Sequence, residues 1–120
     1  NRATGQFLKI MHWNAEGVNS KKDGYSKKVE LENILNEEQV YVCCLQETHL
    51  NEDVFKVRCF QYYQSDRKDR KGGVLTLVRN SISTCQFVEY MEGAEYQMLH
   101  LRTSNTEFRL LNYNCTEYTI

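Results

Sequence analysis

The stretch Val40-Tyr41-Val42-Cys43-Cys44-Leu45-Gln46-Glu47-Thr48-His49 is an apolar run that ends abruptly in a carboxylate. A run this short, rich in β-branched and sulfur-containing side chains, is typical of a buried strand rather than a helix. Ligands of open α/β sheets bind outside the carboxyl ends of the strands. Glu47 is therefore either a ligand for a hard cation at such an edge or a solvated glutamate in a loop. His49 is either an ordinary histidine or a contact that orients the site.

Residues 7–14 form a second strand-like run whose end is also polar. Asn14 and Glu16 stand at this end, and the following Gly17 suits a turn. Two strand ends of this kind would deliver Asn14, Glu16 and Glu47 to one place. The three side chains are the candidate site of this chain.

The segment between the two runs has helical periodicity from Val29 onward. Apolar side chains recur at the spacing of one helix face, at Leu31, Ile34 and Leu35. Ser26 is the expected N-cap. A strand, a helix and a second strand form a right-handed crossover, which makes the two strands parallel neighbours. We therefore expect the polar groups that follow both strands to meet at one edge of the sheet.

The rest of the chain is predicted to form short strands. Residues 55–62 alternate apolar and polar side chains, as a half-exposed strand does. Four further runs are predicted to form an antiparallel meander, at residues 74–78, 84–90, 96–101 and 108–113. Turns are expected between them, at residues 80–81, 92–93 and 104–105. The fold class is thus α/β, with a mixed sheet covered by one clear helix.

Two basic segments are candidates for contacts with DNA phosphates. The stronger candidate lies just before a glycine pair and contains Arg67, Lys68, Arg70 and Lys71. A charged hairpin turn explains the same residues without DNA. The other candidate is the lysine-rich passage at 17–28, which is either a basic finger on DNA or a solvated surface loop.

Composition limits the chain to one small domain or a part of one. It has 120 residues, of which 41% are hydrophobic and 26% charged, enough for a single core. The formal net charge is −1, so any contact with nucleic acid must come from local basic clusters. No apolar run is long enough to span a membrane, and the N-terminus lacks the apolar core of a signal peptide.

The cysteines favour a reducing compartment. There are five of them, an odd number without a CxxC pair, which argues against a disulfide framework or a structural zinc site. We expect all five to be reduced, buried thiols of a nuclear or cytoplasmic protein. They are Cys43, Cys44, Cys59, Cys85 and Cys115.

Two motifs together resemble the endonuclease/exonuclease/phosphatase family. They are Trp13-Asn14-x-Glu16-Gly17 and Cys44-Leu45-Gln46-Glu47-Thr48-His49-Leu50, and Gly72-Gly73 follows where the family has a Gly-Gly strand. The chain is most similar to the apurinic-like endonuclease domains of non-LTR (LINE-type) retrotransposons. The resemblance implies the N-terminal half of a four-layered α/β sandwich, over residues 7–117. It departs from the family at Asn114 and Thr116, where the family usually has an active-site Tyr and a Pro.

The resemblance also implies a chemistry, metal-assisted phosphodiester hydrolysis of DNA. Glu47 and Glu16 would hold Mg2+, with Mn2+ as the alternative ion, and Asn14 and Glu47 would be the catalytic residues. Partners would be DNA, the C-terminal half of the domain and a reverse transcriptase in the parent polyprotein. The resulting nick would prime reverse transcription.

A second interpretation is a non-catalytic retroelement remnant, which acts as an interaction module or has no function. The family's Asp-x-Asn and Asp-His motifs belong to a C-terminal half that this sequence does not include. We therefore expect the chain alone to bind Mg2+ weakly and not to nick DNA. We also expect one apolar sheet face to be exposed for lack of a partner sheet.

Overall fold

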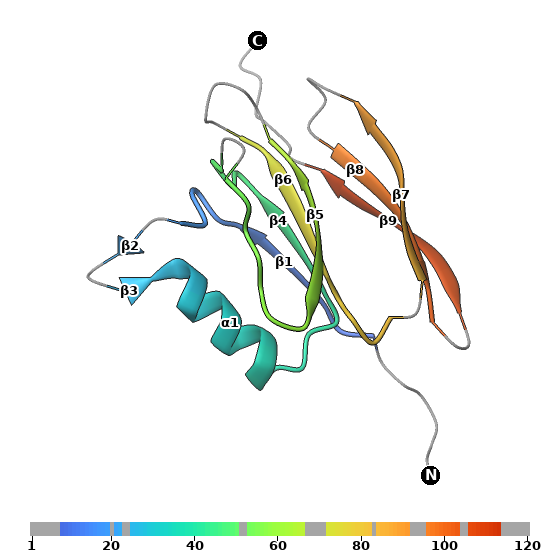
Figure 1. The fold of residues 1–120 in the computed structure, drawn as a ribbon, viewed down its shortest axis with the longest axis horizontal. Coiled ribbons are helices and arrows are strands. Elements are labelled where there is room, and N and C mark those ends of the chain that lie inside the picture. Colours follow the sequence, from blue (N-terminus) through green and yellow to red (C-terminus); the bar gives the residue numbers. More distant parts are fainter. Residues whose placement is uncertain are drawn as a thin grey trace.

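The computed structural model arranges the chain in three layers: a helix, a four-stranded sheet and a three-stranded sheet (Figure 1). The structure describes residues 8–19, 21–22, 25–50, 53–66, 72–82, 84–91, 96–103 and 106–113. All structural statements below concern these residues.

The four-stranded sheet has the order β1-β4-β6-β5. Its strands are β1 (Ile10–Asn14), β4 (Val42–Gln46), β6 (Val74–Arg79) and β5 (Phe60–Ser65). β1 and β4 are parallel, with Ile10 opposite Val42 and Asn14 opposite Gln46, whereas β6 is antiparallel to both of its neighbours. The mixed sheet and the parallel pair were both expected from the crossover pattern, and both are confirmed.

Helix α1 (Lys27–Glu37) covers one face of this sheet. Ser26 is the N-cap, as predicted, and its hydroxyl accepts a hydrogen bond from the amide of Val29 at 3.5 Å. Leu31 and Leu35 are buried against the sheet. The apolar side chains they meet come from both strands and loops, and include Cys43, Leu45, Phe55, Leu75 and Leu77.

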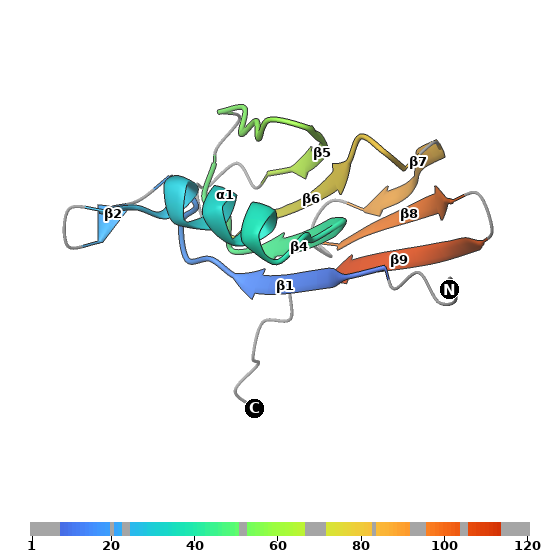
Figure 2. The same ribbon diagram turned by 90° about the horizontal axis from the view of Figure 1, so that it is seen from below.

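The three-stranded sheet covers the opposite face of the first sheet (Figures 1 and 2). It has the order β7-β8-β9 and consists of β7 (Thr84–Met91), β8 (Tyr96–Arg102) and β9 (Glu107–Tyr113). The buried apolar side chains between the sheets are Val42, Cys44, Val78, Ile82, Leu99 and Leu101. The prediction of an uncovered apolar sheet face was wrong for β4 and β6, because this chain supplies a partner sheet that covers them; on β1 the same face is exposed, Ile10 included.

Two strand predictions need correction. The predicted strand at 55–62 begins only at Phe60, after a turn in which Cys59 has a positive φ of 74°. Phe55 and Val57 are buried without strand pairing, so the alternation in this segment marks a loop that packs on the helix side of the core. The predicted strand at 74–78 belongs to the first sheet, not to the meander. Its residues are buried on both faces, as in a central strand.

The remaining predictions concern short loops and turns, some of which lie outside the residues that the structure describes. The passage at 17–28 contains a two-strand ladder, β2 (Lys21–Lys22) with β3 (Tyr25–Ser26), that lies beyond the start of α1 (Figure 2). A turn occurs at 80–81 as predicted, whereas the turns at 92–93 and 104–105 are outside the described residues. So are the basic cluster Arg67, Lys68, Arg70 and Lys71, and the positions Asn114, Cys115 and Thr116. No described helix is long and apolar enough to cross a membrane.

Three cysteines are described as free thiols. Cys43 and Cys44 are buried in β4, as expected, but Cys59 is exposed and lies in the turn before β5. The expectation that all five thiols are buried is therefore wrong for Cys59.

Candidate functional site

Asn14, Glu16 and Glu47 lie at the same edge of the first sheet, which we call the acidic edge. Asn14 is the last residue of β1, and Glu47 directly follows β4. Beyond the strands the two loops stay paired: the amide of Ala15 donates to the carbonyl of Gln46 at 2.9 Å, and that of Gly17 donates to the carbonyl of Glu47 at 2.7 Å. Glu16 and Glu47 therefore stand on adjacent loops that are hydrogen-bonded to each other.

Contacts with His49 and Gly72, both among the described residues, help to hold the side chain of Glu47. Its Oε2 atom lies 3.1 Å from Nε2 of His49 and accepts a hydrogen bond from the amide of Gly72 at 3.1 Å. The Glu47 side chain is 25% exposed, so these contacts form in a partly desolvated place. His49 thus makes the orienting contact that was one of the two alternatives for it.

Unusual backbone conformations concentrate at this edge. Among the described residues other than glycine, five have a positive φ, and three of them are Glu16 (48°), Glu47 (54°) and His49 (53°). A side chain in this left-handed region costs about 1–2 kcal/mol relative to a right-handed conformation. Such strain is common where a loop must place a functional side chain, and here the paired loops hold it in place.

The glycine pair that precedes β6 packs directly on the Glu47 loop. The amide of His49 donates to the carbonyl of Gly72 at 3.0 Å. Gly73 has a φ of 91°, and a Cβ atom built on it would lie 2.6 Å from Oγ1 of Thr48. Only glycine fits this position. The Gly-Gly signal was visible in the sequence, but the amide that Gly72 donates to Glu47 was not.

Asn14 lies on the face of β1 opposite the helix. Met11 and Trp13 alternate with it along β1 and pack on the helix side of the core. Asn14 itself is exposed and is the register partner of Gln46. Its side chain is therefore accessible beside the end of β4.

Lys27 binds the loop that carries Glu16, a role that was not predicted from the sequence. Its Nζ atom donates to the carbonyl oxygens of Ala15 at 2.6 Å and Glu16 at 3.1 Å. Lys28, the next residue, lies over the ring of Phe55, with Nζ 5.3 Å from its centroid. These two lysines of the basic passage at 17–28 thus make contacts within the fold. The run Ser26-Lys27-Lys28 at a helix start was the available signal.

The donor set of the acidic edge suits a weakly held hard cation. Glu16 and Glu47 supply carboxylate oxygens, and Mg2+ is commonly bound by one or two carboxylates with water and substrate phosphate completing its shell. No group of three or more His, Cys, Asp or Glu side chains that could hold a metal occurs among the described residues. The edge therefore fits such an ion as part of a site rather than as a closed cage.

Comparison with known families agrees with this architecture. Residues 11–114 match the Endonuclease/Exonuclease/phosphatase family. The match covers most of the chain, including both strand-end motifs and the glycine pair, and this chain belongs to that family. A search of curated proteins found no match.

Solved structures include a relative of the same fold. The endonuclease domain of TRAS1, a telomere-specific non-LTR retrotransposon, is similar over 91% of this chain with a TM-score of 0.60 and 16% sequence identity. This chain spans 46% of the length of that domain. The expected family and the expected mixed α/β fold are both confirmed.

Proposed function

We propose that this chain is the N-terminal part of a divalent-metal-dependent DNA endonuclease of the non-LTR retrotransposon type. The observation that carries the proposal is the pairing of the Glu16 and Glu47 loops at the carboxyl ends of β1 and β4, in a chain of this family. The similarity to the TRAS1 endonuclease domain supports the choice of type.

In this proposal Glu47 and Glu16 hold Mg2+, or Mn2+ in its place. When bound, such an ion polarises a phosphoryl oxygen and stabilises negative charge on the leaving 3′ oxygen. His49 and the amide of Gly72 keep the Glu47 carboxylate at the edge of the sheet. Asn14, exposed at the end of β1, orients the phosphate by hydrogen bonds, so that Asn14 and Glu47 are the residues that act on the substrate.

The basic cluster is proposed to bind the DNA backbone near the reacting phosphate. The sequence between β5 and β6 carries its four cations, Arg67, Lys68, Arg70 and Lys71. The segment ends at Gly72, whose amide donates to Glu47. Lys71 is thus the chain neighbour of a residue in direct contact with the proposed metal ligand. Cations so close along the chain are suited to phosphates on either side of the scissile bond.

Further parts are proposed to lie outside this chain. A C-terminal half of the domain would supply the groups that activate water, and a reverse transcriptase in the same polyprotein would extend the nicked 3′ end. We propose a nuclear or cytoplasmic location, where buried thiols such as Cys43 and Cys44 stay reduced. The second candidate is a non-catalytic remnant. The small donor set among the described residues favours it, because two carboxylates alone do not make a complete hydrolytic site.

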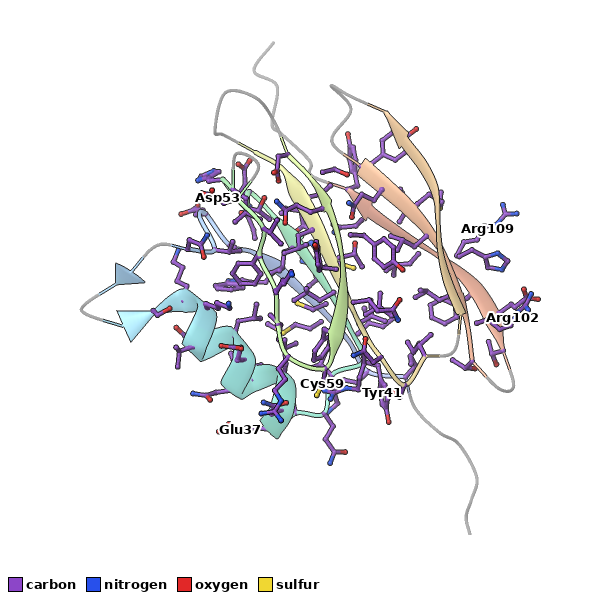
Figure 3. All side chains as sticks on the ribbon, viewed as in Figure 1. Glu37, Tyr41, Asp53, Cys59, Arg102 and Arg109 are labelled. Atoms are coloured by element: carbon purple, nitrogen blue, oxygen red, sulfur yellow. The ribbon has the colours of Figure 1, made fainter. Side chains whose placement is uncertain are left out.

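The test is binding of Mn2+, whose unpaired electrons broaden the NMR signals of nearby amides. We expect Mn2+ to broaden the amide signals of Gly17 and Gly72 in the native chain and much less in the Glu47→Gln variant. Glu37→Gln is the matched control, because Glu37 is exposed at the far end of α1 (Figure 3). Equal broadening in the native chain and in Glu47→Gln would refute the assignment of Glu47 as a metal ligand.

A further inference from the structure

A cluster of polar side chains is buried between the two sheets, where the other buried residues are apolar. Each member is at most 3% exposed, and together we call them the polar clasp. Its members are Gln46, Thr76, Gln97 and Asn112. A buried amide or hydroxyl without partners costs stability, so a cluster in this position must be well satisfied by hydrogen bonds.

The polar clasp is satisfied by a continuous chain of hydrogen bonds. Gln46 Nε2 donates to Asn112 Oδ1 at 2.5 Å, and Asn112 Nδ2 is 3.0 Å from Oγ1 of Thr76. Thr76 Oγ1 donates to Gln97 Oε1 at 2.8 Å. Gln97 Nε2 then donates to the carbonyl of Tyr63 at 2.8 Å and to Oγ of Ser65 at 2.9 Å. The clasp thus connects β4, β9, β6, β8 and β5 across both sheets.

The polar clasp is hydrogen-bonded to the C-terminal end of β4, which directly precedes Glu47. Asn112 Nδ2 also reaches the carbonyl of Leu45 at 3.4 Å and that of Leu75 at 3.0 Å, while its Oδ1 binds the side chain of Gln46. Asn112 therefore contacts both residues that immediately precede Glu47. Gln46 is also the register partner of Asn14 on β1. A shift of β4 by one residue would break the bonds from Asn112 to Gln46 and to the carbonyl of Leu45, and would turn Gln46 to the other face.

From these contacts we propose that Asn112 and Gln46 are positioning residues that fix where Glu47 stands at the acidic edge. The bonds are directional, so they define one position of β4 relative to β9 in the facing sheet, whereas apolar packing alone tolerates small shifts. The importance of that position rests on the proposed function of Glu47. The position itself is a property of the fold and is testable without metal.

The experiment is amide hydrogen exchange by NMR on the metal-free chain. Two reporter amides read the placement of Glu47: Gly17, which donates to its carbonyl, and Gly72, which donates to its Oε2. The amide of Val40, bound to the carbonyl of Leu35 at 3.0 Å, is the reference at the C-terminal side of α1. The variant is Asn112→Leu, and the control Leu99→Ala removes buried volume from the same layer outside the clasp.

We expect Asn112→Leu to accelerate exchange at both reporter amides about tenfold more than at the reference, since it leaves the buried Gln46 amide unpaired. Leu99→Ala should accelerate all three amides by a similar factor. Gln46→Met, which keeps the side-chain length, should reproduce the selective effect and serves if Asn112→Leu does not fold. The double variant Gln46→Asn with Asn112→Gln should restore part of the protection.

Uniform acceleration of reporters and reference in both Asn112→Leu and Gln46→Met would overturn the inference, because the clasp would then only hold the sheets together. Since the measurement uses no metal, failure of the Mn2+ test would remove the proposed role of Glu47 without touching this result. The two failures are thus distinguishable.

Discussion

The carboxylate of Glu47 accepts a hydrogen bond from the amide of Gly72, which lies 25 residues further along the chain, at 3.1 Å. The same glycine accepts a bond from the amide of His49 at 3.0 Å. The glycine pair therefore packs against the acidic edge, and the backbone conformation of the pair determines the position of the Glu47 carboxylate. A substitution at either glycine should therefore shift the Glu47 carboxylate, even though neither glycine has a side chain.

Gly73→Ala is expected to destabilise the chain by about 1–3 kcal/mol. A Cβ atom at this position would lie 2.6 Å from Oγ1 of Thr48, and the φ of 91° disfavours any side chain. Thermal or urea unfolding measures the effect. Adding Thr48→Ala removes the steric clash but not the backbone strain, so the double variant should recover part of the loss. Native stability in Gly73→Ala would contradict the geometry of this loop.

Two buried threonines should respond in opposite ways to the same substitution. Thr48 is 1% exposed and its hydroxyl has no hydrogen-bond partner among the described residues, whereas Thr76 is fully buried within the polar clasp. Thr76→Val leaves partners unpaired and should cost about 1–3 kcal/mol, while Thr48→Val should be neutral or slightly stabilising. Urea unfolding of both variants decides the matter. A larger loss in Thr48→Val than in Thr76→Val would show that the hydrogen-bond assignment is wrong.

Much of the fold was predictable because its signals are local. The helix at Lys27–Glu37 follows from apolar spacing and from Ser26 as its cap, and the parallel pair follows from the short crossover. The start of β5 was not predictable, because Phe55 and Val57 alternate like a strand but are buried in a loop. Periodicity reports which side chains are buried and not whether their backbone is paired.

For the candidate site, too, the features with local sequence signals were predictable and the long-range contacts were not. Asn14, Glu16 and Glu47 could be placed at one edge, because they end strands whose parallel order was evident. The contacts that hold them could not be predicted. Lys27 reaches the Glu16 loop across 11 residues of sequence, and Gln46 meets Asn112 across 66. Such long-range pairs depend on the packing of loops and sheets, which no local pattern encodes.

Cysteine reactivity should divide sharply between the two buried thiols of β4 and the exposed Cys59. Burial, with the neighbouring Cys44 adding to it, raises the pKa of the Cys43 thiol to about 12, and burial raises that of Cys44 to about 11. A raised pKa keeps these thiols protonated at pH 8, and the thiolate is the reactive form. Alkylation at pH 8 followed by peptide mass spectrometry should find Cys59 modified before Cys43 and Cys44. Equal labelling of Cys43 and Cys59 in the folded chain would contradict the structure.

The basic cluster should account for most of the salt dependence of DNA binding. Its four cations are Arg67, Lys68, Arg70 and Lys71. Replacing all four with Gln should reduce the slope of log affinity against log salt by up to about 0.9 for each phosphate that the chain no longer neutralises. The control replaces four exposed cations elsewhere, including Arg109 on the outer side of the second sheet (Figure 3); they are Lys9, Lys56, Arg58 and Arg109.

Fluorescence anisotropy with a short duplex at several salt concentrations provides both slopes. A control variant whose slope falls as much as that of the cluster variant would mean that the chain binds DNA through its general charge. An unchanged slope in the cluster variant would remove the cluster from the proposed interface.

The chain alone is expected not to nick DNA. Its described residues contain no group of three or more side chains that could hold a metal, and the chain spans 46% of the TRAS1 endonuclease domain to which it is similar. With two carboxylates at the acidic edge, Mg2+ stays mostly hydrated and loosely bound. Groups that activate water by acid/base catalysis typically contribute about 10²–10⁴-fold, and none is assigned in this chain.

A plasmid-nicking assay with Mg2+ measures this directly, with the native chain and the Glu47→Gln variant compared at equal concentration. We expect both proteins to leave the supercoiled plasmid intact. Nicking at the same rate by both proteins would indicate a contaminating nuclease. Nicking by the native chain that disappears in Glu47→Gln would refute the expectation. It would mean that Glu16, Glu47 and the groups around them already form a sufficient hydrolytic site, because only a reaction that depends on Glu47 distinguishes the two proteins.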